Sequence, residues 1–591
     1  MKSKFKEILS SATNVVQNYA FVLLIALLAA ISFTILVDNN SLTEESKNIF
    51  TRFGLCSLLG ISLLFALNTL SERIGKKFLL NISGIVFLAL YFQFFLPHHN
   101  DDFGTVEVVI LVLSFILSHL LVSFLAFFEK NNENQFWQYN KNLFINVVLT
   151  GIFTTVLVGG IMLAITAVDN LFDLDLDNKI YPRTFVMLAI FGSCFIFLLF
   201  NEDGLKALEK DGNYPDILKF FVQFVLIPLL IIYAIILYLY GAKILFKWDL
   251  PRGWVSYLIL AYSLVGILAL LLVFPLKEIA AKSWVKGFSK IFYFALLPLL
   301  VLLFVAIFTR ILEYGFTENR YYVLLLAIWL TVVVLYFSFW KKANIKFIPV
   351  SLFAFGLFSL IFPYFNTFSV AKNSQKIELQ EILVKNNLLE NGKINLNKRI
   401  NNSDANEISE KFDFLKERNE LNYLKKYFNE SETKKIAFFY QKRINFKIKE
   451  EFKNVKYSKD IKNGEKYTQL NIRANSFNYS IKGYDQIIKI YNYDNENFSY
   501  EGNTFSLKGF NGGLTLYFNG NTIDLSPEVQ KIINTYKNQQ GEVYTDQISF
   551  VKQVGNYELK FLLEGISKNQ YRGERDTYYI SNDVIILIKK K

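Results

Sequence analysis

A short polar and aromatic segment, residues 310–322, separates two long apolar runs of the chain. Its charged side chains stand at the edge of lipid-soluble sequence, where charges are normally paired, capped or functional. Its two arginines could hold an anionic group, because a guanidinium donates parallel hydrogen bonds to phosphate or carboxylate. The predicted ligand- or anion-binding residues are Arg310, Glu313, Tyr314, Thr317, Glu318, Arg320 and Tyr321, with Tyr322 as a further wall.

The same segment also fits a tight helical hairpin. Arg310 and Glu313 are three residues apart and can pair on one helix. Gly315 suits a left-handed helix end, and Thr317 can cap a following helix that has Glu318 in its first turn. Both interpretations, the hairpin alone and an outward-facing pocket, remain open from the sequence.

A second cluster of aromatic and basic residues joins two other apolar runs. Its members are Trp248, Pro251, Arg252, Gly253 and Trp254. Tryptophans are typical anchors at a membrane interface, and a Pro-Arg-Gly sequence predicts a turn. The cluster therefore predicts anchoring or, alternatively, ligand contact on the same face as residues 310–322.

The histidines give weaker signals. A loop after Pro97 holds the possible metal ligands His98, His99, Asp101 and Asp102. Adjacent residues rarely point at one ion, so a polar turn explains this composition as well, and we predict neither a metal nor a cofactor. His119 lies alone within an apolar run, which makes it a functional candidate; a neutral imidazole bonded to a neighbouring helix is the alternative.

Residues 372–591 contain neither histidine nor cysteine. This excludes histidine acid–base chemistry, cysteine nucleophiles and ordinary zinc sites from that part of the chain. No phosphate-binding loop, GxSxG or HExxH motif occurs anywhere in the sequence. We therefore lean away from an enzyme.

The elements that must position these residues are long apolar helices, since 52% of the residues are hydrophobic and they concentrate before residue 371. The apolar runs predict about eleven membrane spans. These are Tyr19–Val37, Phe53–Leu70, Phe78–Leu96, Val108–Phe128, Leu143–Val168, Thr184–Phe200, Phe220–Tyr240, Trp254–Phe274, Ile291–Phe308, Tyr322–Phe339 and Phe347–Val370. Segments on the N-terminal side hold about twice as many Lys and Arg as the opposite loops, which predicts a cytoplasmic N-terminus.

The predicted fold is a polytopic α-helical membrane protein with a C-terminal extracytoplasmic α+β domain, mainly antiparallel β. Helical spacing predicts an amphipathic helix on the cytoplasmic face over 1–18, before a helical bundle over 19–370. A helical connector over 371–430 precedes a region of two-residue alternation, 431–591, which is typical of β-strands. The net charge of +12 suits anionic headgroups or acidic glycans, although the more ordinary explanation is a solvated lysine-rich surface.

Several motifs together resemble a bacterial membrane family, that of domain of unknown function 4153. They are Phe136-Trp-x-x-Asn-x-x-Leu-Phe144, Tyr214-Pro-Asp-Ile-Leu218, Leu226-Ile-Pro-Leu229 with Tyr233, the segments 248–254 and 310–322, and Ser374-Gln375. The resemblance is strongest over about residues 136–390. It implies a protein of the bacterial inner membrane, without a known activity or catalytic residues.

Three classes of function follow. The first is a non-enzymatic scaffold or binding protein of the cell envelope, whose partners are the lipid bilayer and an envelope protein, anionic lipid or glycan, and not nucleic acid. The second is a transporter or flippase for an anionic or lipid-linked substrate. The third is a membrane-embedded transferase that uses Glu313 or Glu318 as a base.

Overall fold

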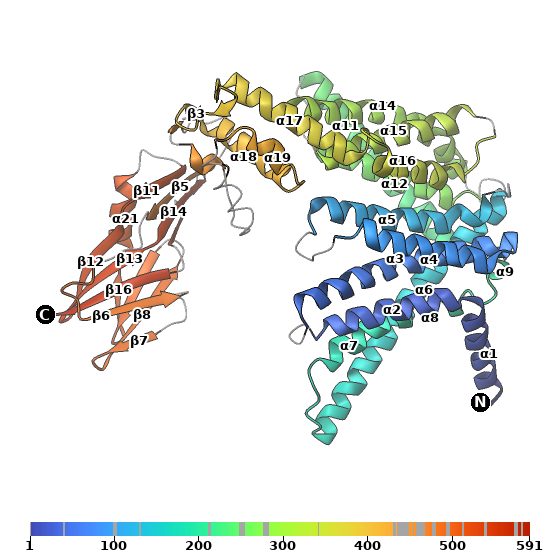
Figure 1. Ribbon diagram of the computed structural model, residues 1–591, viewed down its shortest axis with the longest axis horizontal. Helices are drawn as coiled ribbons and strands as arrows, with labels where there is room; N and C mark the ends of the chain where they lie inside the picture. The colour runs from blue at the N-terminus through green and yellow to red at the C-terminus, as the bar shows by residue number, and fades with distance from the viewer. Residues whose placement is uncertain are drawn as a thin grey trace. The chain divides into compact units, whose positions relative to one another are not determined.

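A computed structural model of the chain separates into two compact units, residues 1–398 with 406–453, and residues 399–405 with 454–591. Figure 1 traces the chain from blue to red. The structure describes residues 2–38, 42–97, 103–128, 132–210, 214–247, 254–275, 283–340, 342–429, 433, 448–452, 454–456, 467–474, 480–491, 497–510, 513–536, 541–571, 577–580 and 583–591.

The first unit is helical. Within the described ranges, nine helices are long and apolar enough to cross a membrane, and a tenth would arise if α1 and α2, which meet at a bend of 93°, counted as one span. The helices up to residue 208 are α1 (Lys2–Asn18), α2 (Ala20–Leu36), α3 (Glu44–Ile74), α4 (Lys77–Phe94), α5 (Thr105–Phe124), α6 (Glu133–Phe172), α7 (Ile180–Met187), α8 (Ser193–Leu199) and α9 (Leu205–Leu208). Those that follow are α10 (Asp216–Phe221), α11 (Ile227–Lys247), α12 (Trp254–Leu272), α14 (Ser283–Tyr314), α15 (Glu318–Phe339) and α16 (Phe347–Ile361).

The prediction of about eleven spans is not confirmed. The run Phe347–Val370, predicted as one span, is not one continuous helix. There the apolar run divides into α16, which has 15 residues, and a separate helix, α17 (Thr367–Lys385). Pro363 follows the end of α16 and cannot continue its hydrogen-bond ladder. Asn366 then caps α17 by accepting a hydrogen bond from the N–H of Ser369 at 2.9 Å.

Local signals fix where several helices begin and end. Thr43 caps α3 by accepting from the N–H of Ser46, with two glutamates in the first turn. The same helix ends at Gly75, whose φ of 73° is left-handed. Asn132 caps α6 in the same way, and α6 then continues for 40 residues.

In the described part of the chain, two π-helical segments interrupt the helices. In η4 (Leu188–Gly192), the hydroxyl of Ser193 donates to the carbonyl of Ala189 at 2.6 Å and so competes with the backbone ladder. In η5 (Val222–Leu226), the following Pro228 has no N–H to donate to the preceding turn. Such π segments are frequent at functional sites.

Among the described residues, the apolar core of this unit has two clusters. One joins residues of α1–α6, α8 and α9, drawn blue to cyan in Figure 1, and the other joins residues of α11, α12, α14 and α15, drawn green to yellow. Phe337 of α15 packs against both clusters. After α17 the chain forms a short hairpin, β1 (Leu389–Glu390) with β2 (Lys393–Ile394), and the helices α18 (Asn402–Lys416) and α19 (Leu421–Lys425).

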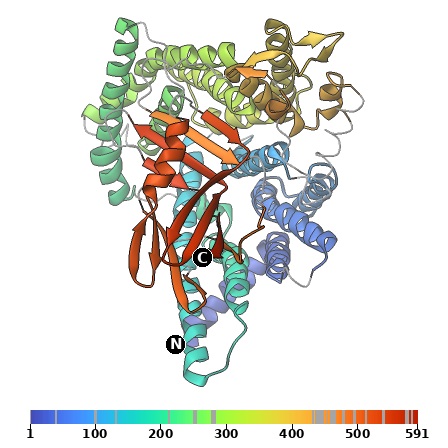
Figure 2. The ribbon, with the colours of Figure 1, turned by 90° about the vertical axis from the view of Figure 1, so that its left-hand side faces the viewer.

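The second unit is built from β-sheets, as the two-residue alternation predicts. Its strands β3 (Arg399–Asn401) and β4 (Asn454–Lys456) pair in parallel. Three four-stranded sheets have the orders β10-β9-β8-β7, β11-β5-β14-β15 and β12-β13-β16-β6, and they are antiparallel except for the parallel pair of β11 and β5. Figure 2 shows these strands and α21 (Ser526–Thr535) in orange to red.

The strands of these sheets occupy most of the described chain after residue 466. They are β5 (Tyr467–Ala474), β6 (Gln486–Tyr491), β7 (Asn497–Tyr500), β8 (Asn503–Phe510), β9 (Gly513–Phe518), β10 (Asn521–Asp524), β11 (Gly541–Thr545), β12 (Ile548–Val554), β13 (Tyr557–Leu563), β14 (Gly565–Tyr571), β15 (Thr577–Ile580) and β16 (Asp583–Lys590). Their inward-facing residues and two residues of α21, Val529 and Ile533, form one buried apolar core.

Candidate functional sites in the helical unit

We call the polar segment 310–322 the joint. It contains the end of α14, a tight turn and the start of α15. Gly315 ends α14 with a φ of 70°, and its N–H donates to the carbonyl of Ile311 at 2.8 Å. Thr317 occupies the cap position of α15, but its side chain makes no capping hydrogen bond. The predicted capping role of the Thr317 hydroxyl is therefore wrong, although the predicted helix boundary is right.

Side chains form hydrogen bonds with backbone groups of the joint that the two helices leave unpaired. Arg320 donates from one nitrogen to the carbonyls of Tyr314, at 3.0 Å, and Gly315, at 2.7 Å. Gln375 of α17 donates to the carbonyls of Tyr314 and Phe316 at 3.0 and 2.9 Å. The hydroxyl of Ser374, its neighbour, accepts from the N–H of Phe316 at 2.8 Å. Gln375 and Arg320 thus satisfy carbonyls around the helix end, and Ser374 satisfies one N–H.

A buried ion pair ties the joint to α18 and the turn after it. The guanidinium of Arg418 donates two hydrogen bonds to the carboxylate of Glu318, at 2.6 and 2.8 Å, and each side chain is only 5% exposed. A third nitrogen of Arg418 donates to the carbonyl of Phe414 at 2.9 Å. This bidentate geometry is the strong form of the arginine–carboxylate contact.

Arg310 and Glu313 of the joint are more open, whereas Tyr321 is buried. Arg310 lies 3.8 Å from Glu313, and both Arg310 and Arg320 lie over the ring of Tyr314. Tyr321 donates its hydroxyl to the carbonyl of Phe365 at 2.8 Å. Most of the polar groups of the joint thus have protein partners, and a ligand role for them stays a prediction.

The other predicted sites fall largely outside the described residues. This applies to Trp248, Pro251, Arg252, Gly253, His98, His99, Asp101 and Asp102. Trp254 is described: it begins α12 and is 78% exposed. Among the residues that are described, the structure groups no set of three or more His, Cys, Asp or Glu side chains that could hold a metal ion.

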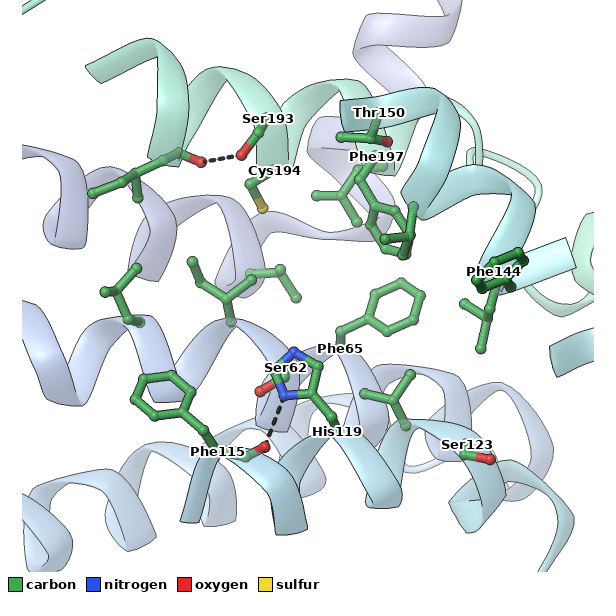
Figure 3. Close-up of a pocket in the computed structure, with 18 of the residues that line it drawn as sticks. Ser62, Phe65, Phe115, His119, Ser123, Phe144, Thr150, Ser193, Cys194 and Phe197 are labelled. Carbon is green, nitrogen blue, oxygen red and sulfur yellow. Dashed lines mark hydrogen bonds between the residues drawn. The ribbon is translucent and has the colours of Figure 1, made fainter. Parts of the chain in front are cut away.

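A partly open cavity of about 580 Å³ lies among the helices of the first unit, and Figure 3 shows it. Its walls come from α2, α3, α5, α6, η4 and α8. The volume lies in the range of small-molecule sites, and the walls are mainly apolar with a few polar side chains, as such sites usually are. The polar residues and the thiol in the walls are Ser62, His119, Ser123, Asn140, Thr150, Ser193 and Cys194.

His119 projects from α5 into this cavity, as Figure 3 shows. Its Nδ1 lies 2.8 Å from the carbonyl oxygen of Phe115, one turn earlier on the same helix. The alternative that the imidazole bonds to a neighbouring helix is therefore wrong. Because a carbonyl only accepts, Nδ1 carries a proton, and in the neutral form of the ring the lone pair lies on Nε2.

The other polar side chains of the cavity are mostly bonded within the protein. Ser123 donates to the amide oxygen of Asn140 at 2.7 Å, and the Asn140 nitrogen donates to the carbonyls of Ser123 and Phe136 at 3.2 and 2.9 Å. Thr150 differs, because it is 8% exposed and its hydroxyl is without a hydrogen-bond partner among the described residues. An unsatisfied buried hydroxyl costs stability unless a ligand or water supplies its partner.

A second cavity, of about 510 Å³, lies on another face of α3 and α5. Ser62 lines the first cavity and Ser118 lines the second, and their hydroxyls are hydrogen-bonded at 2.7 Å. This buried pair therefore lies in the seam between the two cavities.

Sequence reasoning identified His119 but missed the residues around it. Single Ser, Thr and Asn residues within apolar runs are common in membrane helices, so their types alone carried little information. One signal was present: Asn140 is the asparagine of the Phe136-Trp-x-x-Asn motif.

Comparisons with known proteins agree with the resemblance noted in the sequence. The model of the family described as "Domain of unknown function (DUF4153)" matches residues 19–391, a range that includes both the joint and the cavity. A curated relative, an uncharacterised protein of Pasteurella multocida (strain Pm70), is 33% identical over 229 residues, and the match spans 37% of this chain and 37% of that protein. No solved structure matches the chain. By the extent of the family match, the chain belongs to the DUF4153 family.

Proposed function

We propose that the protein is a multi-pass binding protein of the bacterial inner membrane that holds an amphipathic lipid inside its helical unit. The cavity beside His119 is the observation that carries this proposal. A transporter is the second candidate, treated below.

The location of the cavity supports a ligand that arrives from the bilayer. In the predicted spans that contain α5, α6 and α8, only 17%, 11% and 11% of the residues of the apolar stretch are buried inside the protein. In α3 the buried share is 61%. Helices with so little protein cover present apolar side chains to lipid when they cross a membrane. A lipid could therefore enter between them from the side without leaving an apolar environment.

The proposal also places the C-terminal β domain outside the cytoplasm, where it would meet an envelope protein or a glycan. Its support is the excess of Lys and Arg on the N-terminal side of the predicted spans, together with an odd number of spans, as the nine long apolar helices of the described ranges would give. A phosphatase that is active only in the periplasm, fused after Lys591, should be active. A silent phosphatase together with a fluorescent cytoplasmic fusion would overturn this orientation.

The test of lipid binding compares the lipids that stay with the protein in native nanodiscs. Cys194 lines the cavity, so Cys194→Phe should fill part of it. Val156→Phe is the matched control, because Val156 is 70% exposed on α6 and does not line the cavity. The wild type and the control should retain a reproducible lipid that the filled variant loses.

Identical lipid profiles in the filled variant and the control would overturn the binding function. Because Cys194→Phe could unfold the protein, Ala189→Leu in η4 provides a smaller obstruction of the same cavity. Thermal melting of each variant identifies any that lose their fold.

Transport of a lipid is the second candidate function. Two cavities lie on different faces of α3 and α5, and each has one residue of the hydrogen-bonded pair Ser62–Ser118 in its wall, so a lipid could pass from one cavity to the other at this point. A transporter would have to open this seam. Ser62→Ala should then change the rate at which a fluorescent lipid crosses proteoliposomes. Equal rates in liposomes with and without the wild-type protein would rule transport out.

A further inference from the structure

We propose that the lipid held beside His119 is a neutral lipid alcohol, whose hydroxyl donates a hydrogen bond to Nε2 of that imidazole. The proposal rests on the binding function above and specifies the chemistry of the ligand. Two kinds of lipid have this chemistry, an apolar chain with a free hydroxyl: a diacylglycerol and a long isoprenoid alcohol.

Most donors of the cavity other than Thr150 are already in use. Ser193 donates to the carbonyl of Ala189, and both hydrogens of the Asn140 amide go to carbonyls. Ser123 donates to Asn140, and Ser62 is bonded to Ser118 and to the carbonyl of Leu59 at 3.2 Å. A ligand that only accepts hydrogen bonds would therefore find few partners here.

An acceptor, in contrast, is available. The bond from Nδ1 of His119 to the Phe115 carbonyl places the proton of a neutral imidazole on Nδ1, so the lone pair of that imidazole lies on Nε2 and can accept. In Figure 3 the imidazole rises from α5 among the side chains of the other walls. A ligand hydroxyl at this nitrogen would be satisfied inside an otherwise apolar space.

The charge of the walls selects against an anionic headgroup. Among the described residues that line the cavity, none is Lys, Arg, Asp or Glu. A phosphate or carboxylate placed there would lose its hydration without gaining a cation, which costs far more than the transfer of a hydroxyl. The two arginines of the joint, Arg310 and Arg320, do not line this cavity.

Thr150 provides an independent observation. Its hydroxyl is buried, lines the same cavity and has no partner among the described residues. Because a threonine hydroxyl both donates and accepts, it could bond a second oxygen of the ligand. A diacylglycerol offers ester oxygens for this bond, whereas an isoprenoid alcohol does not.

The experiment measures binding to the full-length protein in nanodiscs by native mass spectrometry. The probes are dioleoylglycerol and geranylgeraniol, the methyl ether of each, and the corresponding phosphates, phosphatidic acid and geranylgeranyl phosphate. At least one alcohol should bind more tightly than its ether and its phosphate. His119→Phe, which keeps a ring but removes the acceptor, should weaken that alcohol about three- to tenfold and leave its ether unchanged.

The two alcohols distinguish the source of the ligand. A preference for dioleoylglycerol that Thr150→Val removes identifies a diacylglycerol, and an unchanged preference for geranylgeraniol identifies an isoprenoid alcohol. Equal binding of alcohol and ether, or tighter binding of a phosphate, would overturn the inference while lipid binding itself stands. If Cys194→Phe leaves the binding of every probe unchanged, the cavity is not the site and the proposed function fails instead.

Discussion

The joint and the cavity use polar groups in opposite ways. In the joint, charges are dense and most have protein partners: Glu318 with Arg418, and Arg320 with two backbone carbonyls. In the cavity, polar groups are sparse, and His119 and Thr150 each retain unused hydrogen-bonding capacity.

This difference shows that charge density is a poor guide to a ligand site at a membrane boundary. A buried charge is retained only with its partner, so dense charges indicate a structural connection as readily as a binding site. A polar group that the protein leaves unsatisfied in an apolar wall is the stronger signal, because only a ligand or water can repay its burial.

The largest effect should come from breaking the buried ion pair of the joint. Arg418→Met leaves the Glu318 carboxylate buried and alone, so the free energy of unfolding should fall by about 3–5 kcal/mol. Denaturant unfolding in detergent micelles measures the loss. The double variant Glu318→Leu/Arg418→Met should recover most of it, because no uncompensated charge remains.

Arg310→Gln is the matched control for this prediction. Its partner Glu313 lies 3.8 Å away and both side chains are more than a third exposed, so the loss should stay below about 1 kcal/mol. Equal losses for Arg310→Gln and Arg418→Met would show that burial does not distinguish the two pairs.

A smaller loss should follow from adding a methyl group at the turn of the joint. In Gly315→Ala the residue would keep a φ of 70°, and its Cβ would lie 2.7 to 2.9 Å from atoms of Glu378, Ser374 and Gln375. The left-handed conformation alone costs about 1–2 kcal/mol, and the contacts add to it. Thermal melting should show a clear decrease.

The control for the turn is Gly159→Ala within α6. A Cβ at Gly159 meets no described heavy atom within 4 Å, and alanine favours helix by about 0.5–1 kcal/mol. A gain at Gly159 and a loss at Gly315 are expected, and a gain at both positions would contradict the tight packing of the joint.

In the cavity, removal of a polar group should raise the free energy of unfolding, whereas the changes in the joint lower it. Thr150→Val removes a hydroxyl that lacks a partner, so the delipidated protein should gain about 1 kcal/mol. Thr155→Val is the control, because the Thr155 hydroxyl already donates to the carbonyl of Gly151 at 2.8 Å. A loss of stability in Thr150→Val would mean that the Thr150 hydroxyl is satisfied.

The smallest effect is a pH dependence of stability that comes from Glu420, which directly precedes α19 and pairs with two lysines of α17. Burial raises the pKa of Glu420, but the hydrogen bonds and charges of Lys376 and Lys372 outweigh it, and the pKa falls below its usual 4.5. A lowered pKa in the folded state stabilises the protein above the unfolded-state pKa, and this contribution disappears as the pH falls through the folded-state value. Melting temperatures should therefore drop less steeply below pH 4.5 in Glu420→Gln than in the wild type.

The sequence predicted most of the helices, the turn at Gly315 and the β-sheets of the second unit, because apolar periodicity and turn residues act locally. It did not predict the pairing of Glu318 with Arg418, since these residues are 100 positions apart and only the folded chain brings them together. The cavity was missed for the same reason, because its walls come from helices spread over residues 22–198.

The length of α6 has a consequence for the membrane itself. At about 1.5 Å per residue, its 40 residues extend for about 60 Å. The hydrocarbon core of a bilayer is about 30 Å thick. A rod of this length must lean strongly, project beyond one leaflet or thicken the lipid around it. Because α6 also forms a wall of the cavity, bilayer thickness becomes a variable that could widen or narrow the space beside His119.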